Sequence, residues 1–78
     1  MLNNQKEIID IGKRIRQLRL KKGYTSHETF AYEFELSRVQ YWRIESGKTN
    51  ITISSLISIL NIHKINLEDF FKLKIESQ

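Results

Sequence analysis

Apolar residues recur along the first third of the chain at intervals of three and four, which is the spacing of one face of a helix. The stripe consists of Ile8, Ile11, Ile15 and Leu18. Lysines and arginines between residues 13 and 22 cover the other faces, and those near the end suit the negative pole of a helix. Gly23 follows, and glycine commonly takes the left-handed conformation that ends a helix. The pattern therefore predicts a first helix that ends near residue 22.

Short polar residues predict where four further helices begin. Two residues suit the start of the second helix: Thr25 has capping-box spacing to Glu28, and Ser26 is an equally good N-cap. The later starts are at Ser37, Thr52 and Asn66, whose side chains can accept hydrogen bonds from the first helical turn. We expect these three helices to end near Gly47, His63 and Lys72.

The pattern contains no alternation typical of a strand, and the gaps between the predicted helices are short. A chain of 78 residues can form one small core, and no linker or repeat divides it. We therefore predict an all-α fold: one compact five-helix domain over residues 1–78, with its N- and C-terminal ends less ordered.

The outward face of the third predicted helix carries unusual chemistry. At about 100° per residue, one arc of roughly 140° contains Arg38, Val39, Trp42, Arg43 and Ser46. Tyr41 and Ile44 lie opposite and should anchor the helix to the core. Arginine can bind guanine O6 and N7 with two hydrogen bonds, and a methyl-bearing side chain such as Val39 can contact the thymine methyl group. Together with the short preceding helix and tight turn, this face suits the major groove of duplex DNA.

The net charge of +4 is unevenly distributed. Residues 1–48 hold ten lysines and arginines against six acidic residues, whereas residues 49–78 hold three of each. A local basic excess favours an anionic partner, although a solvated basic surface is the plain alternative. The charge alone does not decide between them.

The sequence offers no recognisable site for a metal, a cofactor or catalysis. Without cysteine there is no thiolate ligand, and two histidines far apart give no metal signature. No set of nucleophile, base and orienting group stands out, and there is no glycine-rich phosphate loop. No apolar run approaches the ~20 residues of a membrane span. We expect a cytoplasmic protein that is not an enzyme, needs no cofactor and does not contact a membrane.

Three segments, in this order and at this spacing, resemble the helix-turn-helix family of phage repressors and Cro, also called the XRE or Cro/cI family. They are "IGKRIRQLRLKKG", "ETFAYEFELSRVQYWRIESGK" and "NITISSLISILNIHKINLEDFF", and the likeness covers about residues 10–72. It implies a lambda-repressor-like fold and a sequence-specific transcriptional regulator of bacterial or phage origin. The recognition helix, about residues 37–46, would enter the major groove. Small members of this family include phage-type repressors, restriction–modification controllers and antitoxins, and the sequence does not choose among them.

The resemblance also implies which residues meet DNA. The positions that contact bases or the nearby backbone hold Arg38, Val39, Trp42 and Arg43. The positions that contact phosphate hold His27, Ser46, Lys48 and Asn50. Ala31 takes the small position where the two motif helices cross. Arg19 and Glu45 take the positions of an ion pair that links the first and third helices.

Some residues depart from the family pattern. Glu35 stands where the motif turn usually has glycine, so a left-handed backbone there would cost on the order of 1 kcal/mol. Tyr41 replaces a β-branched aliphatic residue, which requires a roomier core and a partner for its hydroxyl. Trp42 is far bulkier than the usual small polar residue, so direct contact of its ring with a base is an open question.

The fourth predicted helix carries more apolar residues than one core face needs. They are Ile53, Leu56, Ile57, Ile59, Leu60 and Ile62. An exposed remainder would mark an interface, and a twofold homodimer would place two recognition helices on a palindromic DNA site. The alternative is that a small domain buries all of these residues in its own core.

A second function remains open on the sequence alone. Trp42 could pack on Arg38, or it could lie in an interface with another protein. Tryptophan and arginine are both favoured at protein interfaces. The chain would then be a protein-interaction module or an antitoxin-like partner, using either the Trp42 and arginine face or the apolar stripe of the fourth helix.

Overall fold

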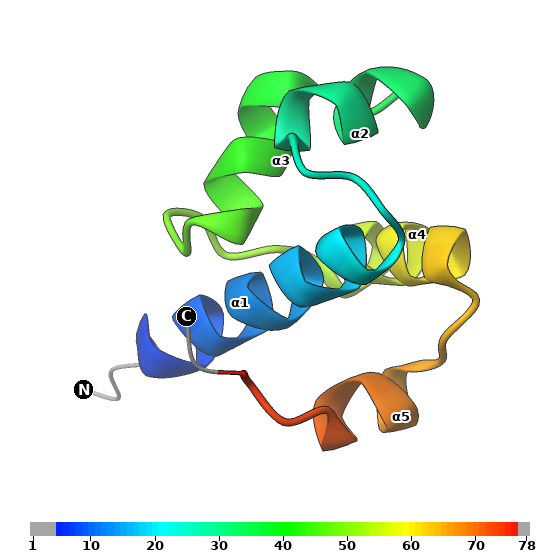
Figure 1. Ribbon diagram of the computed structural model, residues 1–78. Coiled ribbons are helices and arrows are strands. Elements are labelled where there is room, and N and C mark those ends of the chain that lie inside the picture. Colours follow the sequence, from blue (N-terminus) through cyan, green and yellow to red (C-terminus); the bar gives the residue numbers. More distant parts are fainter. Residues whose placement is uncertain (1–4, 77–78) are drawn as a thin grey trace.

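The structure is a computed structural model that describes residues 5–76, and this range is helical without any strand. Its helices are α1 (Gln5–Lys21), α2 (His27–Glu33), α3 (Arg38–Glu45), α4 (Ile53–His63) and α5 (Leu67–Lys72). Figure 1 shows α2 and α3 together on one side of the long helix α1, with α5 on the other side. The predicted all-α fold with a central helix-turn-helix is confirmed. Residues 1–4 and 77–78, at the ends that we expect to be less ordered, lie outside the described residues.

Each of the helices α2 to α5 begins at a polar side chain that accepts a hydrogen bond from the first turn. Ser26 caps α2, because its Oγ accepts from the backbone N–H groups of Glu28 at 3.1 Å and Thr29 at 3.2 Å. Of the two starts that the sequence allows, the structure therefore uses Ser26 and not Thr25. The predicted caps Ser37, Thr52 and Asn66 are confirmed. Each cap of this kind contributes about 1 kcal/mol of stability.

The turn between the two motif helices keeps the left-handed backbone that glycine usually supplies. Glu35 has a φ of 58°, and Leu36 N donates to Ala31 O at 2.8 Å across the turn. The chain thus accepts a conformational cost of about 1 kcal/mol at Glu35. This conformation leads directly into Ser37 and fixes the start of α3.

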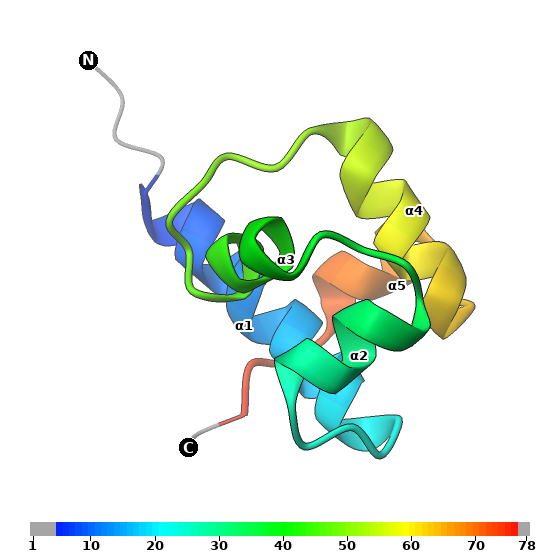
Figure 2. The same ribbon diagram turned by 90° about the horizontal axis from the view of Figure 1, so that it is seen from above.

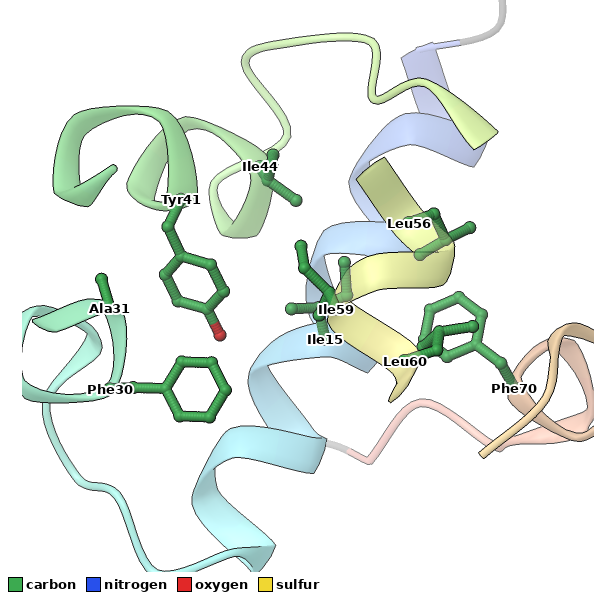
Figure 3. Close-up of a cluster of buried hydrophobic side chains, with 9 residues drawn as sticks. All are labelled: Ile15, Phe30, Ala31, Tyr41, Ile44, Leu56, Ile59, Leu60 and Phe70. Carbon is green, nitrogen blue, oxygen red and sulfur yellow. The ribbon is translucent and has the colours of Figure 1, made fainter. Parts of the chain in front are cut away.

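The hydrophobic core receives side chains from every helix, as Figure 3 shows. Its buried members are Ile15, Phe30, Ala31, Tyr41, Ile44, Leu56, Ile59, Leu60 and Phe70. The predicted anchors of the third helix, Tyr41 and Ile44, are both among them. Ala31 is fully buried, which agrees with the small crossing position that the resemblance implies.

Helices α1 and α3 touch backbone to backbone at Gly12. A Cβ atom added there would lie 2.6 Å from the carbonyl oxygens of Ile44 and Glu45. Backbone atoms inside a packed domain cannot move aside cheaply. Gly12 is therefore required for α3 to pack so closely on α1. This contact sets the position of the recognition helix.

Aromatic rings fill the space beneath α2. The Phe30 ring lies 5.2 Å from the Tyr41 ring and stacks on His63 at 5.4 Å, with an angle of 4° between the planes. The Tyr41 hydroxyl and Nε2 of His63 are buried, and neither has a hydrogen-bond partner in the described range 5–76. The partner that we expect for the Tyr41 hydroxyl is thus not found. Burial raises the pKa of Tyr41, and burial together with the charge of Lys22 lowers the pKa of His63 to about 4. Both groups are neutral at pH 7.

Candidate nucleic-acid interface

One face of α3 presents the four residues that the resemblance assigns to base contact. Arg38, Val39, Trp42 and Arg43 are all exposed. Val39 keeps 61 % of its surface accessible and Trp42 keeps 43 %. Ser37 caps the helix and the buried side chain of Tyr41 anchors it to the core, so the orientation of this face is fixed. The structure therefore displays the predicted base-reading residues together on one rigid helix.

The first turn of α2 lies beside this face. One hollow on the surface is lined by His27 and Glu28 of α2 and by Arg38, Val39 and Trp42 of α3. A second hollow is lined by Arg16, Arg19, His27, Trp42, Glu45 and Ser46. His27 and Trp42 belong to both hollows. The predicted phosphate-contacting residue at the start of α2 is thus next to the predicted base-reading residues, at the junction of three helices.

The loop after α3 places two further predicted residues outside the core. Lys48 and Asn50 are exposed, and the Lys48 N–H donates to the carbonyl of Arg43 at 2.9 Å. Gly47 has a φ of 71°, and a Cβ atom there would lie 2.8 Å from Cγ1 of Ile9. The loop is therefore pressed against α1 before it crosses to α4 (Figure 2). Lys48 follows the end of the recognition helix at a defined place.

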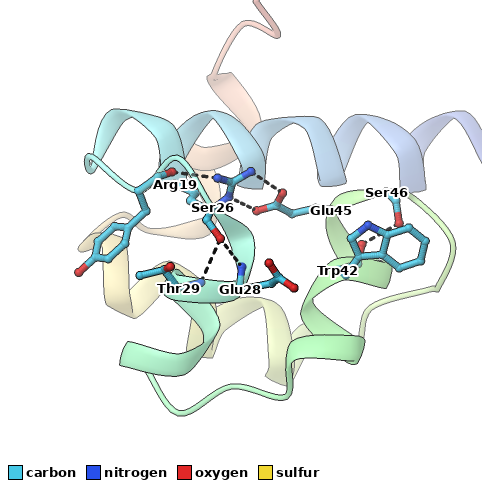
Figure 4. A network of polar contacts seen from close by, with 8 residues as sticks. Arg19, Ser26, Glu28, Thr29, Trp42, Glu45 and Ser46 are labelled. Atoms are coloured by element: carbon cyan, nitrogen blue, oxygen red, sulfur yellow. Dashed lines mark hydrogen bonds and ion pairs between the residues drawn. The ribbon is translucent and has the colours of Figure 1, made fainter.

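Ser46 stands at the C-terminal end of α3. Its Oγ donates to the carbonyl of Trp42 at 2.7 Å, as drawn in Figure 4. The hydroxyl proton therefore satisfies the helix end in the free protein. A hydrogen bond from Ser46 to a phosphate would need this proton to turn away from the helix.

The ion pair that the resemblance implies between α1 and α3 is present. Arg19 Nε donates to Glu45 Oε2 at 2.7 Å and Nη2 donates to Oε1 at 3.0 Å, which makes a two-point contact. Arg19 Nη1 also donates to the Tyr24 carbonyl at 2.8 Å. The side chains of Arg19 and Glu45 are only 5 % and 7 % exposed. Figure 4 shows the Glu45 carboxylate pointing toward Arg19, with Trp42 to one side, so Glu45 holds the end of α3 against α1.

Two charged residues of this surface were not among the predicted site residues. Arg16 lines the second hollow, and in the sequence it is only one of many basic residues on the first helix. Its position three residues before Arg19 places it on nearly the same helix face, which is a usable signal. Glu28 lies near Arg38, with Oε2 3.9 Å from Nη1. No sequence pattern indicates that contact, because it depends on the angle between α2 and α3.

Within residues 5–76, no group of three or more histidine, cysteine or acidic side chains is arranged to hold a metal ion. The same part of the chain contains no helix long and apolar enough to cross a membrane.

Comparison with known proteins identifies the relatives of this chain. The family model described as helix-turn-helix matches residues 15–70. The control protein C.MunI of Mycoplasma sp is 35 % identical over 63 residues, which cover 81 % of this chain and 85 % of the relative. The control protein C.BamHI of Bacillus amyloliquefaciens is 34 % identical over 62 residues, 76 % of each chain. The plasmid copy control protein CopR of Streptococcus agalactiae is 44 % identical over a shorter stretch of 45 residues, 58 % of this chain and 49 % of the relative.

A solved structure has the same architecture. The restriction-modification controller protein C.AhdI of Aeromonas hydrophila superposes with a TM-score of 0.76 at 26 % identity, over 90 % of this chain and all of that one. The family match, the two control proteins and this structure agree with the motif geometry described above. The chain belongs to the helix-turn-helix family of the phage-repressor and Cro type, and it is a sequence-specific DNA-binding transcriptional regulator.

Proposed function

We propose that the protein is a cytoplasmic, homodimeric regulator that inserts α3 of each subunit into the major groove of a palindromic DNA site. In this proposal residues 1–78 act as a single DNA-binding domain, without enzymatic activity. The observation that carries it is the exposed arginine, valine and tryptophan face of α3, seated beside the first turn of α2. That arrangement is the docking geometry of a helix-turn-helix on duplex DNA.

The chemistry of each side chain suggests its role. Arg38 and Arg43 are exposed at successive turns of α3 and would bind guanine O6 and N7. Val39 and Trp42 would contact the apolar part of the groove, which the thymine methyl group supplies. Lys48, Asn50, Ser46 and His27 at the start of α2 would contact phosphates on either side and set the register.

The biological role that we propose is control of restriction–modification genes. Two relatives that match more than three quarters of this chain are named control proteins, and the solved neighbour is named a restriction-modification controller. The plasmid copy control protein matches a shorter part of the chain. A protein-interaction module is not favoured, because these relatives are regulators and the arginine face fits a DNA groove.

We propose a second copy of this chain as the partner on α4. Ile53 and Ile57 are one helical turn apart and remain 61 % and 40 % exposed, and Phe71 on α5 is 47 % exposed. The surplus of apolar residues on the fourth helix is thus left outside the core. A twofold contact through this stripe would bury it and would pair two α3 helices for a palindromic site.

The first experiment is a selection of bound duplexes from a random pool, with the purified protein and with Arg43→Ala. We expect a palindromic motif for the wild type. The variant should lose sequence information at one position in each half-site, because a two-point arginine–guanine contact contributes about 1–3 kcal/mol of discrimination. Lys72→Ala, which removes the same charge from α5, serves as the control and should return the unchanged motif. Enrichment of no motif, or of one indifferent to Arg43, would show that α3 does not read bases and would favour Trp42 as a protein-binding residue.

The dimer is tested by Ile57→Lys, which places a charge in the exposed stripe of α4. We expect the dissociation constant, measured by sedimentation equilibrium, to rise at least tenfold, since burying an unpaired charge costs several kcal/mol. Tyr32→Lys is the matched control, because Tyr32 is 85 % exposed on α2, away from the stripe. A wild type that stays monomeric, or an Ile57→Lys variant that dimerises as well as the control, contradicts this interface.

A further inference from the structure

One carboxylate lies on the surface that we propose binds the phosphates and bases of DNA. Glu28 lies in the first turn of α2 and lines the same hollow as His27, Arg38, Val39 and Trp42. Figure 4 shows its carboxylate on the side of α2 that faces α3. A negative charge here repels the phosphates of any DNA that docks on α3. The Glu28 carboxylate therefore lowers the affinity for DNA of any sequence, and its place on this surface needs a different explanation.

The contact that Glu28 makes indicates that role. Its Oε2 lies 3.9 Å from Nη1 of Arg38, and the two side chains are 60 % and 68 % exposed. An exposed ion pair of this kind contributes little to folding, because water screens it. The same pair becomes stronger when DNA covers the surface and excludes water from it. The contact is thus weak in the free protein and gains strength in the complex.

Arg38 needs such a partner more than the other arginine does. It is the first residue of α3, so no preceding helical turn lies beneath its long and flexible side chain. A guanidinium that reads guanine must present two N–H groups in one plane toward O6 and N7. A carboxylate on a neighbouring helix restricts the orientation of that plane and lowers the entropy lost on binding. The backbone of Glu28 is fixed at the start of α2, because its N–H donates to Ser26 Oγ at 3.1 Å.

We propose that Glu28 is a positioning residue for Arg38, and that it sets the specificity of the protein by orienting this arginine while it weakens binding to non-specific DNA. This inference rests on the proposed function, in which Arg38 contacts a base. It assigns opposite effects to one side chain. The carboxylate favours the correct site through Arg38 and disfavours every site through its repulsion of phosphate.

The test uses full-length Glu28→Gln and Arg38→Ala variants and the double variant. Affinity is measured by fluorescence anisotropy for the selected operator, for an operator with the Arg38-dependent guanine replaced, and for unrelated duplex DNA. We expect Glu28→Gln to bind unrelated DNA about threefold to tenfold more tightly. We expect its ratio of operator to unrelated affinity to fall at least tenfold. In the Arg38→Ala background the same change should no longer affect discrimination at that guanine.

Controls separate this role from simpler ones. Glu68→Gln removes the same charge from α5 and should leave the affinity ratio unchanged, and thermal unfolding of each variant verifies that α2 is intact. If Glu28→Gln raises both affinities equally, the residue is only a repulsive charge and the proposal is wrong. If it alters discrimination equally without Arg38, Glu28 reads a base itself and the proposal is also wrong. Absence of any selected operator would instead contradict the proposed function.

Discussion

Replacing Arg19 by alanine should lower the free energy of unfolding by about 3–5 kcal/mol. The change removes both hydrogen bonds to Glu45 and the one to the Tyr24 carbonyl, at 2.7, 3.0 and 2.8 Å. It leaves the Glu45 carboxylate, which is 7 % exposed in the wild type, without its counter-charge. A buried charge without a partner is far more costly than the loss of an exposed ion pair. Urea unfolding followed by circular dichroism measures the effect.

The double variant Arg19→Met with Glu45→Leu tests whether the charge left on Glu45 causes this loss of stability. It removes both charges together and replaces them by apolar side chains of similar length, so no buried charge is left over. We expect this variant to be more stable than Arg19→Ala by at least 2 kcal/mol, since such replacements are often nearly neutral. If the single and double variants lose equal stability, the packing of the Arg19 side chain, and not the charge left on Glu45, is what matters.

The Arg19–Glu45 pair also matters for DNA binding, because Glu45 is the last residue of α3. This ion pair and the close backbone contact at Gly12 together fix the C-terminal half of the recognition helix against α1. A base-reading helix must hold its side chains within a fraction of an ångström of the productive geometry. Variants at Arg19 are therefore expected to weaken operator binding even under conditions where most molecules remain folded.

The helix starts could be predicted from the sequence because their chemistry is local. Ser37, Thr52 and Asn66 each cap a helix through a backbone N–H three residues later, which is visible as a short polar residue before an apolar run. The starting point of α2 was ambiguous because two adjacent residues have capping side chains. The local hydrogen bonds in the structure show that Ser26 is the cap.

The features that the sequence did not reveal depend on the positions of helices relative to one another. Gly12 lies inside a helical pattern, and nothing in that pattern indicates that α3 approaches it within 2.6 Å of a Cβ position. Lys64 ends α4 with a φ of 56°, a conformation that propensity assigns to glycine or asparagine. The contact of Glu28 with Arg38 joins two helices and has no fixed spacing. The outward face of the third helix, which holds the predicted base-contacting residues, follows from the helical pattern. The phosphate-contacting positions came from the family resemblance, and the contacts of all these residues with DNA stay predictions.

The affinity for the operator should fall steeply as the salt concentration rises. If the dimer neutralises about six phosphates, the plot of log affinity against log salt has a slope near −5. A fourfold rise in salt would then weaken binding about a thousandfold, which is the largest effect that we expect of any single change. The physical cause is the release of counter-ions that condense on duplex DNA. An apolar contact with a protein would show no such dependence, so the same titration separates the two functions.

The Lys48→Ala variant tests how much Lys48 contributes to that salt dependence. Lys48 is exposed in the loop whose place is fixed by Gly47 against Ile9, and each subunit would bring one such lysine to a phosphate. Loss of both lysines should make the slope less steep by about 2 and should weaken binding to all sequences alike, because phosphates carry no sequence information. Arg43→Ala should instead act mainly at one base position. A Lys48 variant with an unchanged slope would remove this loop from the DNA contact, even if α3 reads bases as proposed.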